Sequence, residues 1–246
     1  MTSLQPPLWR RAIAELIGTS VLVAIVVGSG IAAQQLSPND VGLQLLQNST
    51  ATVLGLAVLI LVFGPVSGAH FNPVVSLVDW FLGRRSGSGL PLPDLGLYVL
   101  AQIIGAIGGS VLASAMFEVG TSISTKERAT AGHLLAEVVA TAGLVLLIFS
   151  LAATRRGALA APAVGAYIGA AYWFTSSTSF ANPAVTIGRI FSDTFAGIAP
   201  GSVLPFIAVQ ILGAAVGVGV LLLLFPHADR AADDVVIPHS AEAAKK

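Results

Sequence analysis

The sequence predicts an all-α membrane protein with six transmembrane helices and two re-entrant half-helices arranged as an inverted repeat. Three observations support this prediction. Of the 246 residues, 55% are hydrophobic and only 10% are charged, and the mean hydropathy is +0.86, which is typical of a chain that crosses a membrane several times. Two Asn-Pro pairs interrupt long apolar sequence, and the two halves of the chain share short motifs.

Six stretches are apolar over a length close to the roughly 20 residues that a spanning helix needs. They are residues 12–33, 46–66, 95–117, 133–153, 158–177 and 203–225, and two shorter apolar stretches cover 73–82 and 183–192. The first stretch contains Glu15 and has a counterpart in the second half. These features favour a retained span over a cleaved signal peptide.

The two shorter stretches follow the tripeptides Asn72-Pro73-Val74 and Asn182-Pro183-Ala184. Asn is a strong helix N-cap, and Pro is tolerated at the first helical position because its missing N–H needs no partner there. Each tripeptide therefore predicts the start of a helix that crosses half of the bilayer. A helix that begins at membrane depth must line a cavity or be buried in protein, so two such starts predict a pathway near the bilayer centre.

The basic residues predict the orientation of the chain. A count of six spans places on one side Arg10, Arg11, Arg84, Arg85, Arg155, Arg156, Arg230, Lys245 and Lys246. The positive-inside rule then puts both termini in the cytoplasm, and we expect a multi-pass protein of the plasma (inner) membrane. The formal net charge of zero argues against a nucleic-acid partner.

The halves of the chain match in three places. The matching segments begin at Ala14-Glu15 and Ala136-Glu137, at Asn72-Pro73 and Asn182-Pro183, and at Gln102 and Gln210. Since each copy contains three spans, an odd number, consecutive copies insert in opposite orientations. We expect a first repeat at 1–126, a second repeat at 127–226 and a disordered cytoplasmic tail at 227–246.

Small residues predict close packing between the spans. Three glycine pairs are spaced by four residues, namely Gly105 and Gly109, Gly165 and Gly169, and Gly213 and Gly217. In lipid this spacing lets helix backbones approach each other. The spacing leaves open whether these contacts lie within one subunit or between subunits.

These motifs resemble those of the aquaporin family, the major intrinsic proteins. The resemblance rests on the twin Asn-Pro boxes, the lead-in from Ser67 to Phe71, and the paired Ala-Glu and Gln-x-x-Gly-Ala segments, and it covers about residues 10–226. It implies a right-handed bundle of six helices with two half-helices, a pore in each subunit and a homotetramer.

The two box asparagines have a physical role in such a pore. Each helix N-terminus carries roughly +0.5 elementary charge, so two of them facing one point repel a cation there. The amides of Asn72 and Asn182 donate to the oxygen of a water or polyol, whose own hydrogens then point away and interrupt the chain that proton hopping needs. The alternative interpretation is that both asparagines only cap their helices.

The resemblance also implies a narrow constriction, at which this chain departs from the family pattern. Most members have Arg three residues after the second box Asn, where this chain has Val185, and the other constriction positions correspond to Thr52, Ala170 and Ser179. All four residues are small or uncharged, which predicts a wider and less charged throat. Arg189 follows Asn182 by seven residues, about 10 Å along a helix, and we expect it nearer the outer end.

The four constriction residues, Thr52, Ala170, Ser179 and Val185, match neither the water-selective nor the glycerol-facilitating pattern of the family. They resemble the pattern of its arsenic-linked bacterial branch. A small register shift would instead place Tyr172 or Trp173 at the constriction.

Three polar residues in the spans or beside the first box each have two interpretations. Glu15 and Glu137 lie well inside spans, where a carboxylate needs a partner or water. They are either a proton relay or acceptors for backbone N–H groups of the re-entrant loops, and the resemblance implies the second role. His70 either lines the cytoplasmic pore mouth or braces the loop.

The sequence therefore predicts a passive channel for water and small uncharged solutes, such as glycerol-like polyols and neutral metalloid hydroxides such as arsenite. One alternative is a secondary transporter with alternating access, which also uses inverted repeats. Another is a structural membrane protein whose pore is plugged by Phe71 or Phe180. Without Cys, a metal motif or a nucleophile–base pair, we expect neither an enzyme nor a cofactor or metal site.

Overall fold

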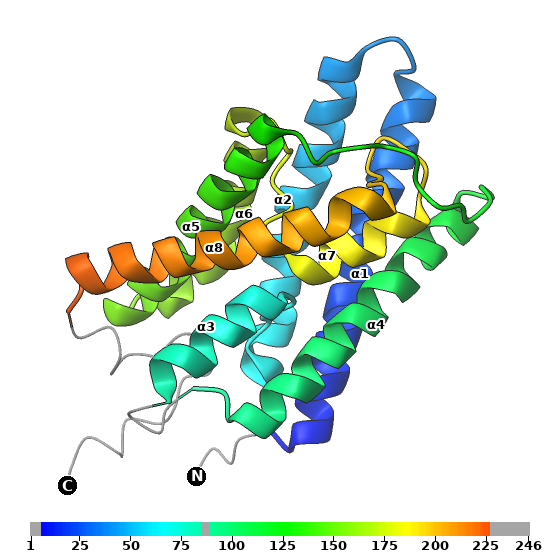
Figure 1. Cartoon of the computed structure of the whole chain (residues 1–246). Coiled ribbons are helices and arrows are strands. Elements are labelled where there is room, and N and C mark those ends of the chain that lie inside the picture. Colours follow the sequence, from blue (N-terminus) through cyan, green and yellow to red (C-terminus); the bar gives the residue numbers. More distant parts are fainter. Residues whose placement is uncertain (1–5, 85–88, 227–246) are drawn as a thin grey trace, which may run out of the picture.

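The computed structural model describes residues 6–84 and 89–226, and within these ranges all regular structure is helical (Figure 1). The helices are α1 (Leu8–Leu36), α2 (Val41–Ser67), α3 (Pro73–Gly83), α4 (Leu92–Met116), α5 (Ala131–Ala153), α6 (Ala160–Phe174), α7 (Pro183–Gly188) and α8 (Pro200–Leu224). Two 3₁₀ turns, η1 (Gly157–Leu159) and η2 (Arg189–Phe191), precede α6 and follow α7. The tail expected at 227–246 lies outside the described residues.

Six of these helices are long and apolar enough to cross a membrane, with η1 and α6 together forming the fifth. The prediction of six spans and two half-helices is confirmed. The ends differ by a few residues, most clearly in α2, which begins at Val41 rather than at residue 46. The reason is a cap: the Asp40 carboxylate accepts a hydrogen bond from the Leu43 amide at 2.9 Å, which starts the helix ahead of the apolar run.

The three glycine pairs lie where spans of the same chain meet. A Cβ at Gly105 would overlap the Leu16 carbonyl of α1, and one at Gly213 would lie 2.6 Å from the Val138 carbonyl of α5. A Cβ at Gly165 would lie 2.9 Å from the Val53 carbonyl of α2. The glycines thus pack α4 against α1, α8 against α5 and α6 against α2, so the contacts lie within one subunit.

The short helices α3 and α7 begin close together in the middle of the bundle and run away from each other (Figure 1). Asn72 and Asn182 are their N-caps, and Pro73 and Pro183 occupy the first helical positions, as predicted. The second half-helix is shorter than the predicted 183–192. Its α-helical part ends at Gly188, where a Cβ would lie 2.6 Å from the Ala106 carbonyl of α4.

Candidate functional site

The two half-helix tips are joined by a reciprocal pair of hydrogen bonds. The Asn72 amide Nδ2 donates to the Ala181 carbonyl at 2.8 Å, and the Asn182 Nδ2 donates to the Phe71 carbonyl at 2.7 Å. Each side-chain oxygen accepts from its own helix, Asn72 Oδ1 from the Val74 amide and Asn182 Oδ1 from the Ala184 amide. Both asparagines therefore cap one half-helix and bind the loop that leads into the other.

A buried carboxylate holds the loop in front of α3. Glu15 of α1 is fully buried, and its two oxygens accept hydrogen bonds from the backbone amides of His70 and Phe71 at 2.9 and 2.7 Å. The Ser67 hydroxyl and the Gln102 amide donate to the same carboxylate, each at 2.7 Å. Four donors surround Glu15, which corresponds to the structural interpretation of this residue.

The second loop repeats this arrangement. Glu137 of α5 is also fully buried and accepts from the backbone amides of Phe180 and Ala181 at 2.9 and 2.8 Å. The Gln210 side chain donates to it at 2.7 Å, as Gln102 does to Glu15. Glutamates 122 positions apart thus hold equivalent peptide groups.

Both loops contain residues with left-handed backbone. Ala69 and Phe71 in the first loop and Ser179 and Ala181 in the second have φ between 46° and 50°. For residues other than Gly this conformation costs about 1 kcal/mol or more each. The glutamate hydrogen bonds offset that cost, because they stabilise the peptide groups that these angles turn toward the carboxylates.

His70 lies in the first loop, two residues before Asn72. Its ring Nδ1 is 2.9 Å from the Ser76 hydroxyl, its ring contacts that of Tyr98 edge-on, and 8% of the residue is exposed. These contacts brace the loop, while the residual exposure leaves part of the residue accessible.

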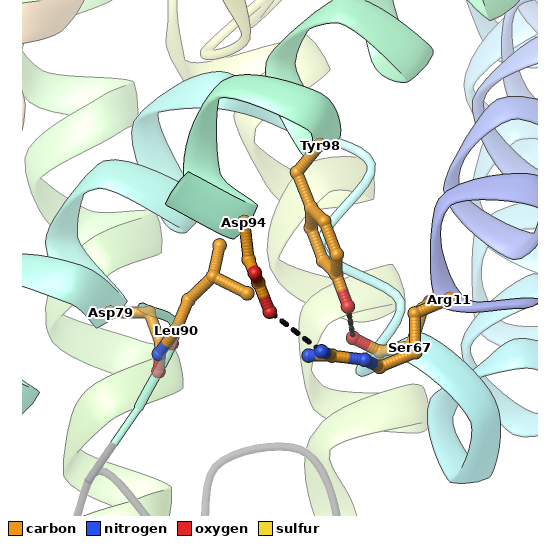
Figure 2. A network of polar contacts seen from close by, with 6 residues as sticks. All are labelled: Arg11, Ser67, Asp79, Leu90, Asp94 and Tyr98. Atoms are coloured by element: carbon orange, nitrogen blue, oxygen red, sulfur yellow. Dashed lines mark hydrogen bonds and ion pairs between the residues drawn. The ribbon is translucent and has the colours of Figure 1, made fainter. Parts of the chain in front are cut away.

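Figure 2 shows the neighbouring network, in which the Tyr98 hydroxyl donates to the Ser67 carbonyl at 2.8 Å and Arg11 pairs with Asp94 at 2.6 Å. The Asp79 carboxylate of α3 accepts from the Leu90 amide at 2.7 Å. The start of α1, the end of α2 and the start of α4 are therefore joined around the first loop.

Three of the four residues expected at the constriction are buried. Thr52, Ser179 and Val185 are 2%, 4% and 5% exposed, whereas Ala170 is exposed on the outer face of α6. Tyr172 is the buried α6 residue, and its hydroxyl lies 3.2 Å from the Thr52 hydroxyl. Trp173 is 53% exposed and donates to Ser49. These positions do not support Ala170 as a constriction residue. They favour the register that places Tyr172 beside Thr52.

The two phenylalanines considered as plugs pack against the protein. The Phe71 ring contacts Phe63 of α2 edge-on and fills the space where a Cβ at Gly18 of α1 would lie. The Phe180 ring contacts Phe206 of α8, with ring centroids 5.3 Å apart. Neither ring therefore lies unpartnered at the meeting point of α3 and α7.

Arg189 lies closer to the second loop than its sequence distance suggests. Its guanidinium is 3.5 Å from the centre of the Phe180 ring, and its Nε donates to the Ala196 carbonyl. Side chains on a helix tilt toward its N-terminus, which is consistent with this long side chain contacting a residue that precedes α7.

Arg128, from the connection between α4 and α5, was not predicted as a site residue. Its guanidinium also faces the Phe180 ring, at 5.3 Å, and it donates to the carbonyls of Gly197 and Phe195. A connecting segment carries no periodic pattern, so the sequence held no signal for this contact.

Comparison with known proteins gives consistent results. A model of the major intrinsic protein family matches residues 2–181. The chain is 49% identical over 209 residues to aquaglyceroporin AqpS of Rhizobium meliloti (strain 1021), covering 84% of this chain and 86% of that one. It is 29% identical over 247 residues to aquaporin AqpM of Methanothermobacter marburgensis, covering 89% of this chain and 97% of the relative.

The fold is similar to that in the X-ray structure of the aquaglyceroporin from Plasmodium falciparum. The TM-score is 0.67 at 20% sequence identity, covering 92% of this chain and 100% of that chain. The twin boxes, their reciprocal contact, the family match over most of the chain and the 49% identical relative all agree: the chain belongs to the major intrinsic protein family.

Proposed function

We propose that this chain is a passive channel through which water and small uncharged solutes of the glycerol type cross the membrane. The observation that carries the proposal is the reciprocal contact of Asn72 and Asn182 where α3 and α7 begin. A side-chain amide has two N–H groups, and each asparagine uses one of them across this contact. The second N–H of each remains for the oxygen of a passing solute.

The surroundings of this point suit neutral solutes. Two helix N-termini meet there, and their partial positive charges repel a cation that must also lose water. In a trans peptide the N–H points opposite to the preceding C=O. With the amides of residues 70, 71, 180 and 181 on the glutamates, the carbonyls of residues 69, 70, 179 and 180 face away from them. These carbonyls provide acceptors for solute hydroxyl groups along the route.

The residues at the outer constriction favour a permissive pore. In this proposal Thr52, Tyr172, Ser179 and Val185 narrow the route, and none of them carries a charge at neutral pH. The Ser179 hydroxyl is buried without a hydrogen-bond partner among the described residues, so it is available to a solute. Polyols and neutral metalloid hydroxides such as arsenite fit this chemistry, and the relative from Rhizobium meliloti bears the name aquaglyceroporin.

A secondary transporter is the alternative, and the carboxylates argue against it. A proton-coupled carrier needs an intramembrane acid that changes partners. Glu15 and Glu137 instead each accept hydrogen bonds from two backbone amides and a glutamine. This arrangement supports a fixed structural role.

We extend the proposal to topology and assembly. The first repeat, 1–126, and the second repeat, 127–226, each contribute one half-helix to a single pore. The basic residues of the sequence favour cytoplasmic termini and insertion in the plasma membrane. Family membership supports a homotetramer with one pore in each subunit, which native mass spectrometry in detergent tests.

Stopped-flow light scattering on proteoliposomes tests the function. We expect water and glycerol permeabilities well above those of empty liposomes, a low activation energy, no saturation and no dependence on an ion gradient. Arsenite uptake into the same vesicles tests the metalloid. High water flux with glycerol and arsenite fluxes at the level of empty liposomes would contradict the permissive pore, and ion-coupled saturable flux would favour the transporter.

Substitution Val185→Arg tests the width of the constriction. A guanidinium at this position narrows the route and adds a charge, so glycerol flux is expected to fall by about tenfold, the change for a barrier increase of about 1.4 kcal/mol, and by more than water flux. The uncharged control Val185→Leu separates volume from charge. An equal loss of water and glycerol flux would count against this role of Val185.

A further inference from the structure

Two arginines occupy the region next to the position where the family resemblance implies a single one. The expected position holds Val185, yet the guanidinium groups of Arg189 and Arg128 both face the Phe180 ring, at 3.5 and 5.3 Å. One comes from the turn after α7 and the other from the connection between α4 and α5. Their convergence is a property of the tertiary structure.

Both arginine side chains donate to the segment 195–197, which follows η2. Three consecutive carbonyls accept from them: Phe195 and Gly197 from Arg128, and Ala196 from Arg189. These contacts position the guanidinium groups and also order this segment. A purely structural role is therefore the competing explanation, and any test must separate it from an effect of charge.

The positive charge at this place is not neutralised by an ion pair. Arg189 is only 1% exposed, and among residues 6–84 and 89–226 neither arginine has a carboxylate within ion-pair distance. Glu137 has an electrostatic effect on both arginines, but its oxygens already accept from Phe180, Ala181 and Gln210. Burial lowers the pKa of Arg128.

The pair also lies beside the proposed solute route. The Ala181 amide donates to Glu137, so the Phe180 carbonyl in the same peptide group faces away from Glu137. The terminal Nη groups of Arg189 have no hydrogen-bond acceptor among the described residues, so they remain as donors for a solute oxygen.

We propose that Arg189 and Arg128 form a displaced cationic filter at the outer end of the pore, which excludes cations and donates to solute hydroxyls in place of an arginine at position 185. This inference rests on the proposed channel function. The filter adds a second electrostatic barrier to that of the two half-helix tips, and it lies on the outer side of them.

The test uses the full-length protein in proteoliposomes with two readouts, glycerol influx by stopped-flow and sodium leak by a trapped sodium-sensitive dye. For Arg189→Gln we expect sodium leak to rise by about tenfold, because one nearby unit charge no longer opposes the ion. Glycerol flux should stay within about twofold, since a neutral solute does not meet that charge.

Charge-matched variants separate the filter from a structural role. Arg189→Lys keeps the charge and loses the forked contacts, so its sodium leak should stay near that of the wild type. Adding Val185→Arg to Arg189→Gln returns a guanidinium one turn earlier and should restore exclusion. A leak in the Lys variant as large as that in the Gln variant would overturn the proposal, because it would show that the contacts matter and the charge does not.

The half-buried Arg128 provides a second test if Arg189→Gln does not assemble. Arg128→Gln is expected to leak sodium and Arg128→Lys is not, by the same readout. An assembled Gln variant with normal glycerol flux and no added leak overturns the filter. Absence of glycerol flux in the wild-type protein would instead refute the channel function itself.

Discussion

The two re-entrant loops are built on one frame and differ in the rings that they carry. In each loop a glutamate holds two backbone amides, a glutamine binds that glutamate, and an asparagine binds the opposite loop. The glutamines also bind equivalent hydroxyls: Gln102 donates to Ser76 and Gln210 to Thr186, both at 3.0 Å. These hydrogen bonds are matched between the two loops, and the difference is the Ser67 hydroxyl, which donates to Glu15 alone.

The rings at equivalent positions have different chemistry. His70 contacts Tyr98 and the Ser76 hydroxyl, whereas Phe180, its counterpart, contacts Phe206 and two arginines. Thr186, the counterpart of Ser76, donates to the Asn182 carbonyl and not to a ring. The shared hydrogen bonds therefore fix where the loops lie, while a few side chains give the two ends of the pore different chemistry.

Removal of either glutamate is expected to have the largest effect. Glu15→Ala leaves the buried amides of His70 and Phe71 without acceptors, and each such group costs about 1–3 kcal/mol. We expect a loss of stability on the order of 4 kcal/mol or more, and an equal loss for Glu137→Ala. Thermal unfolding in detergent, followed by size-exclusion chromatography, measures both. The exposed Glu118→Ala is the control, and a large effect of only one glutamate would break the symmetry.

Enlarging the packing glycines is expected to have the next largest effect. The valine side chain in Gly105→Val would push α4 away from the Leu16 carbonyl of α1. In Gly213→Val it would push α8 away from the Val138 carbonyl of α5. Each should cost about 1–3 kcal/mol, as overpacking does. Gly219→Val on α8 is the matched control, because nothing lies within 4 Å of a Cβ there. Similar unfolding temperatures for Gly213→Val and Gly219→Val would contradict the close contact.

His70→Phe makes the first loop resemble the second. Ser76 loses the ring nitrogen but keeps the Gln102 donor, so the expected cost is about 1 kcal/mol, measured as a shift in unfolding temperature. His70→Gln keeps a polar partner for Ser76 and should lose less. If His70→Phe were as stable as the wild-type protein, the Ser76 contact would have no role in holding the loop.

The smallest expected effect concerns the connection outside the spans. The Thr125 backbone amide donates to Asp193 at 2.9 Å and, with the Thr125 and Ser124 hydroxyls, lowers the pKa of that carboxyl below its ordinary 3.8. A lowered folded-state pKa means that the contact contributes above the unfolded pKa and is lost as pH falls through the folded value. Hydrogen exchange should show Thr125 protected at pH 6 and not below the folded pKa. Asp193→Ala should remove that protection at pH 6.

Much of the fold followed from the sequence because its signals are local. Apolar length predicts spans, and Asn followed by Pro predicts a helix start whatever surrounds it. The start of α2 and the end of α7 were less predictable: a cap at Asp40 starts α2 ahead of the apolar run, and α7 ends at Gly188, which packs closely against Ala106.

The outer constriction stays a prediction. Thr52, Ser179 and Val185 are buried, whereas Ala170 faces outward and Tyr172 lies beside Thr52. A two-residue shift in an apolar helix changes the buried face without changing the composition, and only packing against α2 determines it.

The sequence by itself determined the six spans, the two half-helices and their inverted relation, because hydrophobic length, capping residues and an odd number of spans per repeat act without regard to distant contacts. The tertiary structure alone decided that Arg128 and Arg189 share one aromatic ring. Their meeting depends on a connection, a turn and a loop that are far apart in the chain, and long side chains reach partners that sequence spacing does not specify.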